Sequence, residues 1–211
     1  MLPAKIGVVL AILAISACSS HYTSLEYGTH AQADPPSDGS LVASVSAVDE
    51  RGTPDNWLGA IRGGYGNPLK KIYTDGPTAD AVRAVFEDAL QARGMLGTPE
   101  TSDKAVEITI SKLDCSYYFN REAHAHLSVT VVTLPERTWN FTHAYKTDNS
   151  EGGLGAGIFG DPDYLAEFAE RTLNETIEKI LSDPDFLAAL SAGPAVSRRS
   201  FPLDRAGGLA G

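Results

Sequence analysis

The sequence predicts an α+β domain, with a mostly antiparallel sheet of four to six strands, two longer helices packed on one face and a short carboxyl-terminal helix. Three segments alternate apolar and polar residues with a period of two, which is typical of strands with one buried face. Two further segments repeat apolar residues at helical spacing along a single stripe. We expect these stripes to cover the apolar face of the sheet, because burying both surfaces together removes them from water.

The first part of the domain contains three strand candidates. Residues 41–48 alternate apolar residues with serines and lead into a charged turn at residues 49–52. Residues 57–61 and 69–74 are shorter candidates, and the glycine-rich run 63–67 separates them. We expect strands at all three places, joined by turns.

The first helix is predicted to begin at Pro77 and Thr78 and to end near Gly94, where a left-handed cap is expected. Its apolar residues fall at positions i, i+3, i+4, i+7 and i+8 of one helical face. They are Val82, Val85, Phe86, Ala89 and Leu90.

Three longer strands are predicted next, around residues 106–111, 124–131 and 138–145. A three-residue turn at 135–137 would join the apolar faces of the last two strands, whereas a two-residue turn would split the core. This register predicts the pairs Val131–Phe141, Val129–His143 and Leu127–Tyr145.

Two helices are predicted to close the domain. Asp161 is the expected N-cap of the longer one and Pro162 its first residue, and Asp183-Pro184 repeats this start signal for a short third helix. The apolar stripe of the longer helix consists of Leu165, Phe168, Ala169, Thr172, Ile177, Ile180 and Leu181.

The amino-terminal segment has the features of a targeting signal. Residues 6–15 form an apolar run of about ten residues, too short to cross a hydrocarbon core of about 30 Å but suited to a secretory signal. The run ends in Ile15-Ser16-Ala17-Cys18, which resembles the bacterial lipobox. The resemblance implies a mature chain that begins at a diacylglyceryl-modified Cys18; the alternative is an ordinary cleaved signal with an incidental cysteine. Ser19, rather than an aspartate, follows the cysteine and favours the outer membrane.

The domain boundaries follow from composition. We expect a signal peptide over residues 1–17, a lipid-anchored tether over 18–39, one α+β periplasmic domain over 40–191 and a disordered tail over 192–211. Loss of Lys5 with the signal peptide changes the net charge from −10 to −11. This acidic surface argues against nucleic acid and against membrane binding beyond the lipid itself.

Two motifs could suggest ligand sites. Residues 155–160 read GxGxxG, but acidic residues open the next helix and no strand follows it, so we expect no nucleotide. The three histidines His124, His126 and His143 could suggest zinc. The predicted register places His143 on the buried face and the other two toward solvent, so we expect no metal held by all three. His124 and His126 are left as a surface pair, either weakly metal-binding or ordinary exposed histidines.

The remaining candidates are a loop and a cysteine. Residues 152–160 place Leu154, Ile158 and Phe159 in a run without charge, which either folds back on the core or offers an apolar contact to a partner. Cys115 has no partner for a disulfide once Cys18 is acylated, and we expect a buried apolar side chain rather than a reactive thiol.

We interpret the charged residues Asp49, Glu50 and Arg51 as a charged turn. We identify no catalytic residue and expect no cofactor.

Short motifs along the domain resemble those of a known family. They are, in order, Val48-Asp49-x-Arg51, Leu58-Gly59 and Arg62. Together with the order of strands and helices over residues 41–190, they are similar to the YajG-type uncharacterised bacterial outer-membrane lipoprotein family. The resemblance implies an α+β periplasmic domain on an acyl anchor, with no established enzymatic activity and no functional residues to transfer. The glycine-rich loop and the carboxyl tail depart from that family.

Two hypotheses of function follow. The first is a non-enzymatic envelope lipoprotein, anchored through Cys18, whose domain binds an envelope protein or serves as an auxiliary subunit. The second is a periplasmic hydrolase or metal-dependent enzyme whose site is assembled from residues far apart in the sequence.

Overall fold

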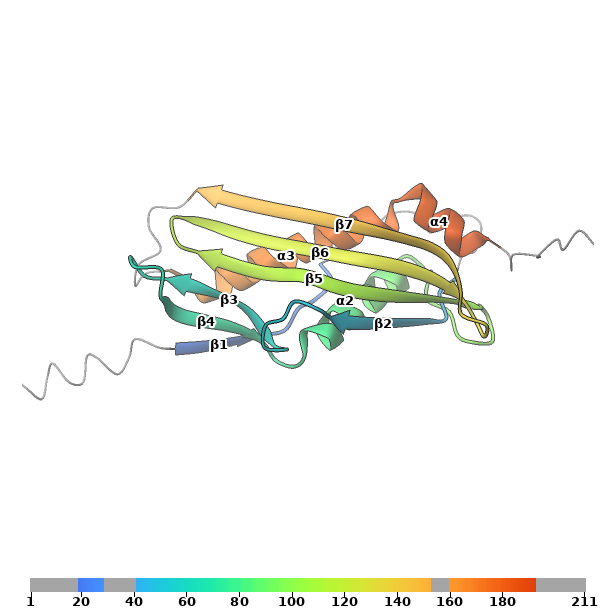
Figure 1. The fold of residues 1–211 in the computed structure, drawn as a ribbon, viewed down its shortest axis with the longest axis horizontal. Helices are drawn as coiled ribbons and strands as arrows, with labels where there is room; N and C mark the ends of the chain where they lie inside the picture. The colour runs from blue at the N-terminus through green and yellow to red at the C-terminus, as the bar shows by residue number, and fades with distance from the viewer. Residues whose placement is uncertain (1–18, 29–40, 153–159, 193–211) are drawn as a thin grey trace, which may run out of the picture.

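Seven strands form one mixed sheet in the computed structural model, which describes residues 19–28, 41–152 and 160–192 (Figure 1). The strand order is β1-β4-β3-β5-β6-β7, and β2 also pairs with β5. The strands are β1 (Ser19–Thr23), β2 (Ser44–Asp49), β3 (Trp57–Arg62), β4 (Pro68–Thr74), β5 (Lys104–Tyr117), β6 (Asn120–Thr133) and β7 (Thr138–Gly152). The helices are α2 (Thr78–Ala92), α3 (Pro162–Leu181) and α4 (Pro184–Ser191).

The predicted number of four to six strands is too low, and the sheet, predicted to be mostly antiparallel, is a mixed one. The sheet has seven strands, and three of its pairings are parallel: β1 with β4, and β2 and β3 with β5. Period-two alternation tells which face a side chain takes, but it does not tell the direction of the neighbouring strand. The predicted meander of β5, β6 and β7 is confirmed as antiparallel.

The helices cover one face of the sheet, as predicted, and α2 and α3 lie behind it in Figure 1. Phe86 of α2 and Leu165 of α3 are completely buried in the core, together with Leu127 of the sheet at 1% exposure. The backbone of Gly94 has φ +65°, which confirms the left-handed cap after α2. Both predicted N-caps are confirmed, because Asp161 and Asp183 each accept a hydrogen bond from a backbone N–H in the first turn of the helix that follows.

The predicted register of β6 and β7 is confirmed at its three central pairs, Val131–Phe141, Val129–His143 and Leu127–Tyr145. The turn itself differs. Thr133 pairs with Thr138, and the register shifts between Val131 and Val132, so that β7 has one additional residue there. The shift pairs Trp139 with Val132, on the face opposite to Phe141, and Trp139 is 76% exposed.

Residues 19–28 differ from the tether predicted over residues 18–39, and residues 18 and 29–39 lie outside the described part of the chain. Residues 19–23 form β1, which pairs in parallel with β4 so that Ser19 lies opposite Lys70. Leu25 is buried in the core, and the backbone of Glu26 is held on both sides by α3: its N–H donates to Glu170, and its carbonyl accepts from Asn174. A short edge strand rich in serine and threonine has no periodic pattern, so no local signal in the sequence predicts it. The first described residue, Ser19, is therefore already part of the sheet.

Candidate functional site

The predicted lipidation and contact residues lie outside the described part of the chain. Cys18 directly precedes Ser19, the first residue of β1. Leu154, Ile158 and Phe159 fall between Gly152 and Gly160. The described flanks of that segment are both tied to the domain, because Gly152 pairs with Asn120 and the carbonyl of Gly160 accepts a hydrogen bond from Lys70 Nζ at 2.9 Å.

Several chain turns meet at one end of the sheet, which we call the Ser19 end. It consists of Ser19, the β3–β4 turn (63–67), the β5–β6 turn (118–119), Gly152 and Gly160, and it lies on the left in Figure 1. The strand pairings explain why these segments meet. β1 begins beside the first half of β4, and β3 runs parallel to the last residues of β5. Segments that are far apart in the sequence thus form one end of the domain.

Three aromatic side chains lie at the Ser19 end, and we call them the aromatic tip: Tyr65, Tyr118 and Phe119. Tyr65 is fully exposed and Phe119 is 67% exposed. The Tyr118 hydroxyl donates to the carbonyl of Gly64 at 2.7 Å, and the Tyr118 and Phe119 rings lie 4.1 Å apart between centroids. These contacts join the two turns that carry the three aromatic residues.

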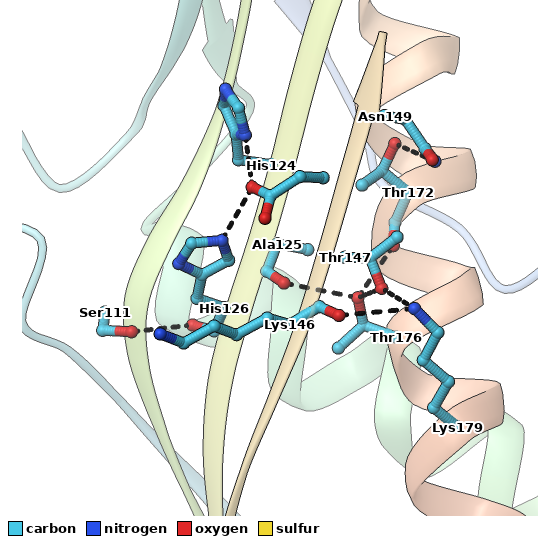
Figure 2. Close-up of polar contacts among 11 residues, drawn as sticks. Ser111, His124, Ala125, His126, Lys146, Thr147, Asn149, Thr172, Thr176 and Lys179 are labelled. Carbon is cyan, nitrogen blue, oxygen red and sulfur yellow. Dashed lines mark hydrogen bonds and ion pairs between the residues drawn. The ribbon is translucent and has the colours of Figure 1, made fainter.

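A second cluster lies on the sheet face that the helices leave open, and Figure 2 shows it between β6 and β7. His124 Nδ1 and His126 Nε2 lie 2.5 Å and 2.8 Å from the same oxygen, Oδ1 of Asp148. His143 is on the other face, where its ring contacts Phe141 and Tyr145. The prediction that the three histidines do not converge is therefore confirmed, although His143 is exposed at the margin of its face.

Asp148, the acidic member of this cluster, was not among the residues predicted from the sequence. The predicted register already implied this contact, because it pairs Val129 with His143. Counting five residues back from Val129 gives His124, and counting five residues forward from His143 gives Asp148. His124 and Asp148 are indeed paired in the structure. Hydrogen bonds to His126 and His124 lower the pKa of Asp148 to about 2. The carboxylate is 55% exposed, so water screens much of this interaction.

The cluster contains three side chains that could act as metal ligands. The ligand atoms of His124, His126 and Asp148 all lie within 4.8 Å of one another, and imidazole nitrogen and carboxylate oxygen are ordinary zinc ligands. Lys112 and Lys146 lie opposite His126 on the two flanking strands. Two ammonium groups next to the site raise the free energy of placing a further cation there.

The residues interpreted as a charged turn form a buried ion pair instead. Arg51, with its side chain 4% exposed, forms a bidentate pair with Asp49, with atoms 2.6–2.8 Å apart. Its guanidinium also donates to the carbonyls of Trp57 and Leu113 and to the hydroxyl of Thr78. Burial acts to raise the pKa of Asp49, but the hydrogen bonds and charge of Arg51 outweigh it and hold the pKa below its ordinary value. The pair therefore joins β3, β5 and α2, which is a structural role.

Cys115 is buried, as predicted, at 2% exposure. Burial raises the pKa of its thiol, first by desolvation and then by the nearby charge of Asp114. The thiol therefore stays protonated at neutral pH, and the side chain packs as an apolar group of the core next to Gly59 of β3.

A groove of about 570 Å³ runs along α3. Three of its charged side chains contact the sheet or the end of α2: Arg171 pairs with Glu151, Glu178 with Arg93, and Lys179 Nζ donates to Thr147 Oγ1 at 2.9 Å. The lining residues are Gly28, Arg171, Asn174, Glu175, Glu178, Lys179 and Ser182. Their arrangement stabilises α3 on the sheet, which is again a structural role.

Comparison with known proteins shows the fold. No protein family model and no curated protein matches the chain. A crystal structure of a Xanthomonas campestris protein of family DUF330 has a TM-score of 0.57 at 12% identity, covering 81% of this chain and 96% of that one. A PelC dodecamer from Paraburkholderia phytofirmans has a TM-score of 0.40 at 9% identity, with 68% and 88% covered. A Neisseria meningitidis lipoprotein has a TM-score of 0.22 at 13% identity, with 63% and 96% covered.

At 12% identity the DUF330 structure shows a shared fold and nothing further, and the other two similarities are too low to support an argument. Among the described residues, no helix combines the length and the apolar character needed to span a bilayer.

Proposed function

We propose that the chain is an acyl-anchored envelope lipoprotein whose periplasmic domain is a non-enzymatic module that binds another protein. The observation that supports this most is that the lipobox-like Ile15-Ser16-Ala17-Cys18 ends one residue before the first strand of the domain. A folded domain that starts directly after Cys18 fits processing at that residue, because nothing of the domain is lost with the signal peptide. Ser19 and the resemblance to the YajG-type family support the outer membrane as the location.

The open face of the sheet is the surface we assign to a protein partner. In the described part of the chain no helix covers it, and α2 and α3 lie on the opposite side (Figure 1). Its central part has short side chains, including Ser128, Thr130, Thr142 and Ala144 on neighbouring strands. A flat surface with short polar side chains lets another protein approach the sheet closely at a low cost in side-chain entropy.

The anchor is tested by mass spectrometry of the mature amino terminus. We expect diacylglyceryl and amide-linked acyl groups on Cys18 in the wild type, and an unprocessed, unacylated precursor for Cys18→Ser. Cys115→Ser is the matched control, because its thiol is buried and takes no part in processing. Normal mature protein from Cys18→Ser in the outer-membrane fraction would refute the anchor.

The protein-binding surface is tested by crosslinking in cells. A photoreactive amino acid replaces Ala144 on the open face and, as the control, Ala84 on α2; both alanines are exposed. We expect a discrete adduct of defined mass from position 144 and none from position 84. Equal yields from the two positions would show that the open face has no specific partner.

The alternative, a metal-dependent enzyme, would use His124, His126 and Asp148. We propose that these residues form an ion-pair cluster instead, because Lys112 and Lys146 flank it. Equimolar Zn²⁺ should then change the unfolding temperature of the wild type no more than that of a His124→Gln/His126→Gln variant. A zinc-dependent rise in the wild type alone would favour the enzyme hypothesis.

A further inference from the structure

The position of the first strand restricts how the domain can sit on a membrane. Cys18 is covalently joined to Ser19, so their Cα atoms are about 3.8 Å apart. Ser19 is fixed in the sheet by its pairing with Lys70. If Cys18 is acylated, as proposed above, the sheet begins at the headgroups with no spacer, and the Ser19 end of the domain must face the bilayer.

The side chains exposed at that end suit this environment. Tyr65 is fully exposed and Phe119 is 67% exposed, although water-facing turns usually have polar residues. Tyrosine and other aromatic rings are favoured at the membrane–water interface, because an apolar ring can enter the acyl boundary while a polar group stays hydrated. Tyr65 lies five residues before Lys70, the partner of Ser19, so the aromatic tip and the anchor are close neighbours in the sheet.

We propose that the aromatic tip (Tyr65, Tyr118 and Phe119) inserts into the interface of the lipid bilayer and holds the domain upright on the membrane. The inference rests on the acyl anchor of the proposed function. The net charge of the mature chain, −11 after loss of Lys5, gives no electrostatic attraction to anionic lipids, so the contact is apolar. A weak apolar contact suffices, because the anchor keeps the tip at a high effective concentration beside the membrane.

The structure of the tip supports insertion as a unit. The Tyr118 hydroxyl holds the β3–β4 turn through the carbonyl of Gly64, and Arg62 Nη1 donates to the carbonyl of Gly66 at 3.1 Å within the same turn. The backbone around Tyr65 is thus fixed before any membrane contact, which lowers the entropy lost on insertion. Asp161 and Asp163 are exposed at the start of α3 at the same end, so zwitterionic lipid is the appropriate probe.

An upright domain places its opposite end far from the lipid. β6 runs the length of the sheet with 14 residues, which corresponds to about 45 Å. Trp139 pairs with Val132 near the far end of β6 and is 76% exposed, so it is a natural reporter for that end. Phe119→Trp provides the matching reporter at the tip, and we call it the tip reporter.

The experiment couples the mature chain through Cys18 to maleimide-bearing lipid in phosphatidylcholine vesicles, with or without brominated acyl chains. Coupling is selective, because the thiol of Cys115 is buried. One variant has Trp57→Phe, Trp139→Phe and Phe119→Trp, and the other has Trp57→Phe alone, which leaves Trp139. Circular dichroism checks the fold of both.

We expect brominated lipid to reduce the fluorescence of the tip reporter about two-fold and to leave that of Trp139 unchanged. Adding Tyr65→Ser to the first variant should weaken the quenching. Equal quenching of the two reporters, or no quenching of the tip reporter, would overturn the proposal and leave the tip as a contact for a protein. Because the lipid is attached chemically, this result does not depend on whether Cys18 is acylated in cells.

Discussion

Gly59 of β3 lies directly against Cys115 of β5, so closely that a Cβ at position 59 would be 2.1 Å from the carbonyl oxygen and 2.6 Å from Sγ of Cys115. These two residues are paired in the parallel contact between β3 and β5. The glycine therefore lets the two strands approach, and the leucine-glycine motif at 58–59 has a structural explanation.

Gly59→Ala should destabilise the domain by about 1 to 3 kcal/mol, because the new methyl group overlaps the backbone of β5 and forces the strands apart. Chemical denaturation measures the change in the free energy of unfolding. Gly64→Ala is the control, since a Cβ there meets nothing within 4 Å. A loss of stability equal in the two variants would mean that the close approach has no energetic consequence.

Arg51→Ala should cost about 3 to 5 kcal/mol, because it leaves the Asp49 carboxylate and the carbonyls of Trp57 and Leu113 without their partner in a largely buried site. Arg83 offers a matched control, since its pair with Glu87 lies on the surface of α2 and its side chain is 40% exposed. Arg83→Ala should change the free energy of unfolding by less than about 0.5 kcal/mol. Similar effects of the two substitutions would contradict a structural role for Arg51.

Phe86→Ala should cost about 3 to 5 kcal/mol, because Phe86 is completely buried and its removal leaves a cavity between α2 and the sheet. Phe119→Ala removes the same ring from an exposed turn and should change the stability by less than about 0.5 kcal/mol in solution. The two unfolding midpoints are compared under the same conditions. An unshifted midpoint for Phe86→Ala would show that the helical stripe does not form the core.

The pKa of Asp148 should be measurable by carbon NMR of its carboxyl group, with a value of about 2 in the wild type. Its hydrogen bonds with His126 and His124 favour the charged form, so a His124→Gln/His126→Gln variant should move the pKa up toward the ordinary value of 3.8. A pKa that is the same in both proteins would show that the histidines do not bond the carboxylate in solution.

The same shift predicts the direction of a pH effect on stability. A carboxyl group with a lowered pKa in the folded state stabilises the fold above its ordinary pKa, and this contribution is lost as the pH falls from 3.8 toward about 2. The difference in unfolding temperature between the wild type and Asp148→Asn should therefore shrink over that range. The effect should be small, because the carboxylate is 55% exposed.

Local patterns in the sequence were sufficient for most of the elements. Helix starts at Asp161 and Asp183, the cap at Gly94 and the central register of β6 and β7 were all predicted correctly, because each depends on a few neighbouring residues or on which face is apolar. The His124–Asp148 pair followed from that register and could have been found. The lipobox-like segment at Cys18 is likewise a local signal.

The tertiary structure decided what depends on contacts between distant segments. It placed β1 in the sheet through parallel pairing with β4, buried Arg51 between β3, β5 and α2, and brought Ser19, Tyr65 and Phe119 to one end of the domain. None of these has a periodic or short-range signature, because parallel partners and turn neighbours are set by the packing of the whole sheet. The sequence by itself determined most of the elements, whereas the segments that meet at the Ser19 end were decided by the pairing of the first strand and the packing of the whole sheet.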